Sequence, residues 1–183
     1  MWQTSVSMGE HLDRQLAAVM FADMVGFTAL MQEDEHLALQ ARAKYAGVLN
    51  AQHAAFGGRI VQYYGDGALT IFPNSLDAVR CAIEIQKELS QPPDVPARIG
   101  IHVGNVIVEP TGLIGDAVNI ASRIESFGVP GGVLVSDSVH DQVRNQFADE
   151  VTAIENREFL LLLNRVPPRL YFDDERVFIK LFV

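Results

Sequence analysis

The sequence predicts an α/β fold in which helices pack against a mixed β-sheet. Two observations lead to this prediction: apolar runs of strand length alternate with segments of helical periodicity, and several strands are joined by short glycine-containing turns. Alternating helices and strands that also form hairpins are typical of a layered fold. The chain has 183 residues, 49% apolar and 20% charged, which suits one globular domain with a substantial core.

The first half of the chain contains three predicted strands around a long helix. Residues 15–23, QLAAVMFAD, form an apolar run that ends in an acid, which is typical of a buried strand. Residues 33–56 have helical periodicity and stop at a pair of glycines. Strands are then expected at Arg59–Tyr64 and Ala68–Phe72, with a tight turn between them.

The second half continues this alternation and closes the sheet. The expected elements are, in order, a helix over residues 76–90 with Ser75 as its N-cap, two strands within 97–109 separated around Gly104, a helix that opens at Gly115-Asp116, a strand over 131–136, a helix after Ser136, and closing strands within 158–183.

The net charge and the lengths of the apolar runs argue against some classes of binding partner. The net charge is −9, which argues against a nonspecific nucleic-acid surface or an anionic membrane as partner. No apolar run approaches the roughly 18 residues that span a bilayer, and the first residues lack the features of a signal peptide. We therefore expect a cytoplasmic protein. Cys81, the single cysteine, lies in a helical pattern and is expected to be a core side chain.

Two aspartates occupy matching places at strand ends. Asp66 lies between Gly65 and Gly67 in the predicted hairpin turn, and Asp23 ends the first strand just before Gly26. An acid in a turn often bonds only its own backbone, so plain turn formation is the alternative for both residues. A loop that opens a helix after Asp23 would also favour a phosphate, and a divalent cation would reconcile that anion with the carboxylates.

A third feature lies on the helix after Gly115. Asn119 and Arg123 are four residues apart and therefore project from one face. An amide and a guanidinium suit a sugar oxygen and a developing phosphoryl charge. The alternative is that Arg123 pairs with a nearby acid such as Glu125 or Asp116.

Four segments together resemble the motifs of the class III nucleotidyl cyclases, the catalytic domain of adenylyl and guanylyl cyclases. They are FADMVGFTALM, GGRIVQYYGDGALTIFP, ARIGIHVGNVIVE and LIGDAVNIASRIES, in family order within about residues 15–143. The resemblance implies a ferredoxin-like βαββαβ core with a mixed, mainly antiparallel sheet and extra C-terminal strands. It also implies a homodimer with shared active sites that converts a nucleoside triphosphate to its 3′,5′-cyclic monophosphate and pyrophosphate.

The resemblance also assigns roles to individual residues. Asp23 and Asp66 fall on the two aspartates that hold two Mg²⁺ (or Mn²⁺) ions, which would activate the ribose 3′-hydroxyl and neutralise the phosphates. Asn119 falls on the residue that orients the ribose, and Arg123 on the one that stabilises the transition state. The triphosphate-holding loop corresponds to the backbone of Met24, Val25, Gly26, Phe27 and Thr28.

The sequence departs from the family at the two positions that read the base. Gln62 stands where adenylyl cyclases carry lysine and guanylyl cyclases glutamate, and Gly112 stands where adenylyl cyclases carry aspartate or threonine. Glutamine both donates and accepts, and glycine has no side chain to offer. ATP is the expected substrate because it is the commoner one in the family, with GTP or both as the alternative. In the tail, Leu163 replaces a phosphate-binding lysine, for which Arg165 or Lys180 could substitute.

The expected organisation is a tail over residues 1–14 and one catalytic domain over 15–183, with a core over 15–147 and closing strands over 148–183. A degenerate cyclase-like module that binds nucleotide or dimerises remains the alternative to an enzyme. A diguanylate cyclase is disfavoured because its GGDEF-type sequence is absent.

Overall fold

The computed structural model describes residues 13–109, 112–147, 152–153 and 177–181. Within them the order of elements is β1 (Asp13–Met24), α1 (Phe27–Glu33), α2 (Glu35–Ala55), β2 (Arg59–Tyr64), β3 (Gly67–Phe72), α3 (Ser75–Leu89), β4 (Ala97–Glu109), β5 (Gly112–Ile114), α4 (Asp116–Ser126), β6 (Gly132–Ser136), α5 (Asp137–Val143), β7 (Thr152–Ala153) and β8 (Val177–Leu181).

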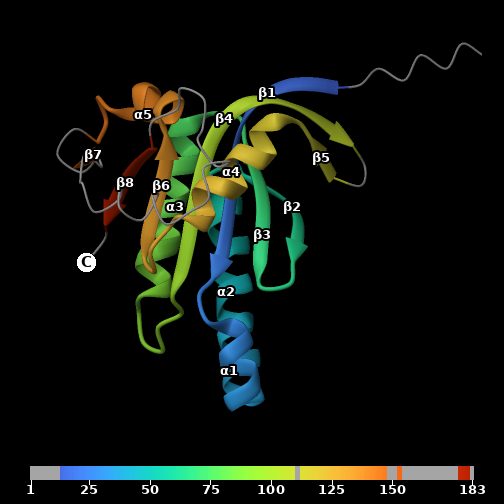
Figure 1. The fold of residues 1–183 in the computed structure, drawn as a ribbon, viewed down its shortest axis with the longest axis vertical. Coiled ribbons are helices and arrows are strands. Elements are labelled where there is room, and N and C mark those ends of the chain that lie inside the picture. Colours follow the sequence, from blue (N-terminus) through green and yellow to red (C-terminus); the bar gives the residue numbers. More distant parts are fainter. Residues whose placement is uncertain (1–12, 110–111, 148–151, 154–176, 182–183) are drawn as a thin grey trace, which may run out of the picture.

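The strands form one mixed sheet, which confirms the predicted fold class. Its order is β2-β3-β1-β4-β6-β8-β7, with β5 paired to the end of β4. Of the strand pairs within the described ranges, β4 and β6 run parallel and the others are antiparallel. Figure 1 shows α2 and α3 behind the sheet and α4 in front of it. In the described part of the chain the sheet is therefore the middle layer, and α4 is the helix on its front face.

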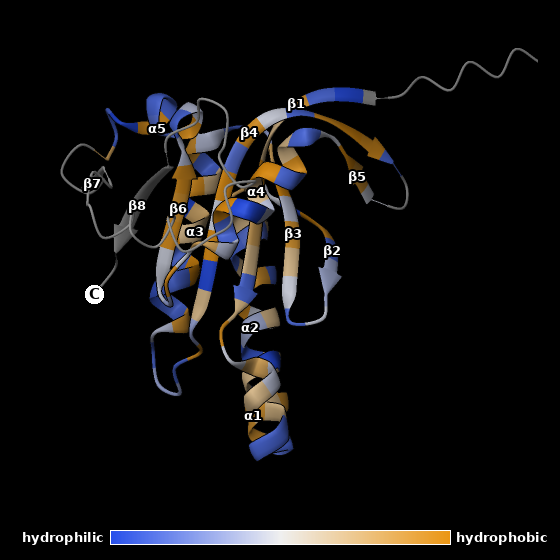
Figure 2. Ribbon diagram, viewed as in Figure 1, coloured by the Kyte–Doolittle hydropathy of each residue, from blue (hydrophilic) through white to orange (hydrophobic). Residues whose placement is uncertain are grey.

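Apolar side chains fill the two faces of the sheet unequally. The larger core lies between the sheet and α2, α3 and α5, and it includes Met20, Leu49 and Ile85. A smaller cluster lies under α4, where Ala117 and Ala121 contact the other face of β1 and β3. Figure 2 shows β6 and the β4–β5 region as mainly hydrophobic and the outer end of α1 as hydrophilic. The predicted core position of Cys81 is confirmed, since its side chain is fully buried.

Most predicted elements are confirmed, but two predictions were wrong. Residues 97–109 form one continuous strand, because Gly104 is needed for close packing and not for a break: a Cβ there would lie 2.9 Å from the Cβ of Ala117 on α4. The N-cap of α3 is Asn74, whose side chain accepts from the N–H of Asp77, while Ser75 is the first helical residue and donates to Gln142.

The closing strands are confirmed at β8, which pairs with β6 and contains Lys180. Leu163 and Arg165 lie outside the described residues. Among the helices of the described ranges, none combines the length and apolar character needed to cross a membrane.

Candidate active site

The two predicted metal aspartates lie on neighbouring strands. Asp23 is near the end of β1, directly opposite Gly67, the first residue of β3. Asp66 comes just before that glycine, and its carbonyl accepts from the N–H of Met24 at 3.4 Å. The structure thus brings Asp23 and Asp66 to one end of the β1–β3 pair, as adjacent antiparallel strands require.

The loop after β1 turns sharply at Gly26, which has a φ of 77° and caps α1. This left-handed conformation favours glycine. The N–H of Met24 donates to Asp66 and that of Val25 donates to Pro96. The N–H groups at positions 26–28 make no backbone hydrogen bond within the described part of the chain. Of the predicted triphosphate loop, only these last three groups are therefore open to an anion.

The two predicted base-reading residues lie close together. Gln62 lies on β2 next to a register shift, and its side chain is exposed. Its Oε1 atom lies 3.8 Å from the position that a Cβ on Gly112 would take. Gly112 has a φ of 159°, a conformation that residues with side chains rarely adopt.

Helix α4 presents Asn119 and Arg123 to solvent, as the four-residue spacing predicts. No hydrogen bond or ion pair joins either side chain to Asp23 or Asp66 among the described residues. The alternative pairing of Arg123 with Glu125 or Asp116 is not found among the described residues, and Glu125 instead lies against Arg98. One chain therefore holds the aspartate pair and the asparagine–arginine pair as two separate groups.

Sequence reasoning missed a row of charges beside Asp23. Arg98 lies on β4 opposite Asp23, and its Nη2 donates to Asp23 Oδ2 at 2.7 Å. On its other side, its Nε lies 3.0 Å from Oε1 of Glu125, as an ion pair without hydrogen-bond alignment. The available signals were a charged residue near the start of a predicted strand and an acid four residues after Ala121, on the same face of the next predicted helix as the buried alanines.

Burial dominates the electrostatics of Glu125. Loss of hydration raises the pKa of its carboxyl to about 7, although the charge of Arg98 acts in the opposite direction. The charges of Asp23 and Asp66 raise that pKa further.

The oxygen ligands at this site suit a hard divalent cation. The carboxylates of Asp23 and Asp66 supply them, and Asp23 is only 27% exposed. In the described ranges no group of three or more histidine, cysteine, aspartate or glutamate residues could hold a metal ion. A cation between the two aspartates would take its remaining ligands from water or from a bound phosphate.

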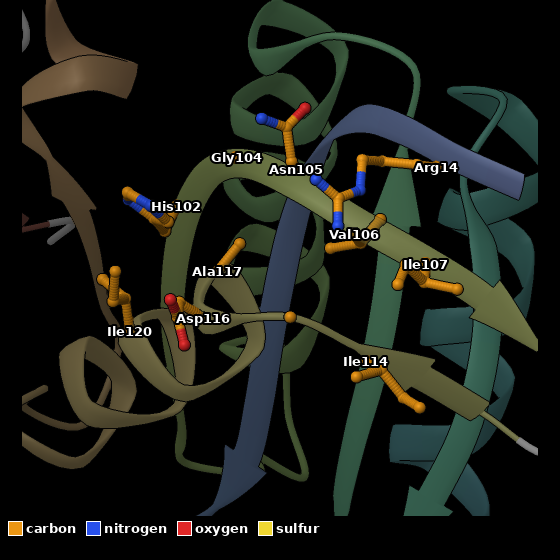
Figure 3. A pocket seen from close by; sticks show the side chains of 11 residues that line it. Arg14, His102, Gly104, Asn105, Val106, Ile107, Ile114, Asp116, Ala117 and Ile120 are labelled. Carbon is orange, nitrogen blue, oxygen red and sulfur yellow. The ribbon is translucent and has the colours of Figure 1, made fainter. Parts of the chain in front are cut away.

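A pocket of about 460 Å³ lies away from the aspartate pair, beside the start of α4. Figure 3 shows Arg14 from β1, His102 and Asn105 from β4, and Asp116 from α4 around it. Asp23, Asp66 and the two predicted base-reading residues, Gln62 and Gly112, do not line this pocket.

Comparison with known proteins places these features in context. The family model described as the adenylate and guanylate cyclase catalytic domain matches residues 12–160. The "Putative adenylate cyclase 3" of Rhizobium meliloti is 37% identical over 147 residues, which is 75% of this chain and 25% of that protein. An adenylate cyclase of Streptomyces coelicolor is 32% identical over 136 residues, 73% of this chain and 35% of that protein.

Among solved structures, the adenylate/guanylate cyclase/hydrolase from Silicibacter pomeroyi is similar in fold. It superposes with a TM-score of 0.76 at 29% identity and covers 93% of this chain and 98% of that one. The chain spans between a quarter and about a third of the length of the two curated relatives.

Proposed function

Because the chain belongs to the family of adenylate and guanylate cyclase catalytic domains, we propose that it converts ATP to 3′,5′-cyclic AMP and pyrophosphate. The observation that carries this proposal is the meeting of Asp23 and Asp66 at one end of the β1–β3 pair. One catalytic domain over residues 15–183, preceded by a tail over 1–14, would perform the reaction.

Asp23 and Asp66 would hold two Mg²⁺ or Mn²⁺ ions. Two neighbouring carboxylates at a glycine-containing turn fit that role, since they offer the hard oxygen ligands that Mg²⁺ prefers. When bound, such ions activate the ribose 3′-hydroxyl and offset the charge of the phosphates.

The residues of the chain itself would bind and orient the substrate. The N–H groups at positions 26–28 would bind phosphate oxygens at the turn into α1. Asn119 would orient the ribose, and Arg123 would stabilise the charge that develops on the phosphoryl group. Because both side chains are exposed on α4 and unconnected to the aspartates, they would serve the site of a second subunit.

A homodimer is also supported by the uneven cover of the sheet. Among the residues that the structure describes, α4 is the one helix that covers this face, and several apolar side chains there stay partly exposed, namely Phe21, Val61, Val108, Leu113 and Val118. A second copy of the chain would cover this face and complete each site.

The choice of ATP over GTP rests on the family's commoner substrate. Gln62 can donate to adenine N1, or accept from guanine N1–H with its amide reversed. With no side chain at Gly112, a single amide is left to distinguish the bases, so a guanylyl or dual-specificity cyclase is the second candidate. The ratio of kcat/KM for ATP and GTP decides between them.

The purified chain, assayed with ATP or GTP and Mn²⁺, tests the activity. Asp23→Asn and Asp66→Asn keep the size of the side chain but remove the charge that holds the cation, so turnover should fall by at least about 10². Asp94→Asn, at an exposed loop position, is the matched control and should retain full activity. Thermal unfolding shows whether each variant is folded.

Cyclic nucleotide and pyrophosphate in equal amounts would support the proposal. Nucleotide binding without product would instead identify a degenerate regulatory module. Near-normal turnover of both aspartate variants would show that Asp23 and Asp66 do not act as metal ligands.

A further inference from the structure

Glu125 is a buried acid to which the proposed reaction assigns no role. It lies on α4, is only 8% exposed, and faces the sheet. Gly100 on β4 makes this approach possible, because a Cβ on that residue would collide with the backbone of Glu125. The helix is therefore pressed against β4 at the point where Glu125 meets Arg98.

Arg98 connects Glu125 to Asp23. Its Nε lies 3.0 Å from Glu125 Oε1, and its Nη2 donates to Asp23 Oδ2 at 2.7 Å. Arg98 and Asp23 are direct partners in the β1–β4 register. A planar guanidinium held on two sides has little freedom to rotate, so its position fixes the position of the carboxylate that it contacts.

This contact determines which oxygen of Asp23 is available. Arg98 occupies Oδ2. The other oxygen, Oδ1, points across to β3 and lies 3.1 Å from the position that a Cβ on Gly67 would take. Gly67 directly follows Asp66, so the available oxygen faces the strand start that carries the second predicted metal ligand.

We propose that Glu125 is a positioning residue for the metal site. Through Arg98 it holds the Asp23 carboxylate with Oδ1 turned toward Asp66, so that a divalent cation meets two oriented ligands. This inference rests on the proposed function, since it concerns the same aspartates. Groups that orient metal ligands in this way typically contribute tenfold to a hundredfold in metal affinity.

If the pair of Glu125 and Arg98 only stabilised the fold, a different outcome would be expected. Breaking a pair that only stabilises the fold lowers stability and leaves metal binding unchanged in the folded fraction. Glu125, however, is removed from water by burial, which offsets much of its attraction to Arg98. Glu125→Gln keeps the shape but removes the carboxylate that holds one side of Arg98, so the guanidinium and the Asp23 carboxylate that it contacts gain freedom to shift. We expect the variant to be as stable as the wild type and to bind metal more weakly.

Titration of the protein with Mn²⁺ alone, followed by electron paramagnetic resonance, measures this effect without turnover. Glu125→Gln should raise the dissociation constant about tenfold or more. Glu125→Asp, which keeps the charge on a shorter side chain, should recover part of the loss. Glu84→Gln, which breaks the exposed pair with Lys87, is the matched control and should bind Mn²⁺ like the wild type. Asp23→Asn gives the dissociation constant for Mn²⁺ that is expected when a metal ligand is lost.

The outcomes separate the two proposals. Wild-type affinity in Glu125→Gln, or a loss fully explained by unfolding, would overturn the positioning role even if the wild type forms cyclic nucleotide. If the wild type forms none but Glu125→Gln still weakens Mn²⁺ binding, the proposed reaction fails and the positioning role stands. Absence of Asp23-dependent Mn²⁺ binding in the wild type would overturn both.

Discussion

At the scale of single residues, the proposed recognition of the purine base rests on one amide, that of Gln62. Gln62 is exposed on β2 and lies close to the backbone of Gly112, which contributes no side chain. Strong discrimination requires that the wrong substrate leave a buried polar group unpaired. A glutamine that can donate or accept imposes this penalty weakly on either purine.

Replacement of Gln62 should therefore redirect base preference. Gln62→Lys presents only donors and should raise the ATP-to-GTP ratio of kcat/KM by about tenfold, while Gln62→Glu should lower it by a similar factor. Gln40→Lys, at an exposed position on α2, controls for the added charge. If both Gln62 variants keep the wild-type ratio, this position does not contact the base. Gly112 is left unchanged because its φ of 159° would strain a side chain.

The sequence predicted which aspartates meet but not what orients them. Asp23 and Asp66 each follow a strand signal and lie beside a glycine, so their placement depends on local pattern alone. The contact between Arg98 and Glu125 depends on how α4 lies across β4. That placement is possible because Gly100 and Gly104 have no Cβ. The sequence shows these glycines, but only the structure shows that α4 packs against them.

At the scale of elements, helix α2 is attached to the loop after α3 by one lysine. Lys44 Nζ donates to the carbonyl oxygens of Gln91 at 2.6 Å and Pro93 at 2.8 Å, and more weakly to that of Leu89 at 3.4 Å. A single ammonium group thus donates hydrogen bonds to backbone carbonyl groups at the end of α3 and in the turn that leads into β4. Because these carbonyls are contributed by the backbone, no charge pattern in the sequence indicated the contact.

Loss of this attachment should lower stability. Lys44→Met keeps the aliphatic stem but removes the donors, so the free energy of unfolding should fall by about 1 to 2 kcal/mol. Lys87→Met breaks only an exposed pair within α3 and should cost less than about 0.5 kcal/mol. Urea unfolding of both variants measures the difference. Equal stabilities would show that water replaces Lys44 at these carbonyls without loss.

At the scale of the whole molecule, the proposed catalytic residues of one chain fall into two groups. The aspartate pair lies at the end of β1 and β3, while Asn119 and Arg123 project from α4 into solvent. The sequence predicted roles for all four residues, but the lack of a direct contact between the two pairs within the described chain is visible only in the structure. In the proposed homodimer, each site takes one group from each subunit.

A mixing experiment tests this arrangement. Asp23→Ala and Asn119→Ala homodimers should each be nearly inactive, since both of their sites are damaged. Random exchange makes about half of the dimers mixed, each with one intact site, so activity should return to about a quarter of that of the wild type. Exchange is verified by native mass spectrometry. No recovery after verified exchange would mean that the four residues act within one chain.

Helix α4 has two functional sides under this arrangement. Its outer side carries Asn119 and Arg123 toward the partner's site, while its inner side carries Glu125 toward Arg98 and the subunit's own Asp23. A rigid helix cannot shift on one side without shifting on the other. Nucleotide bound at one site would therefore change the affinity of the second, and the dimer would show cooperative substrate saturation in place of two independent hyperbolic responses.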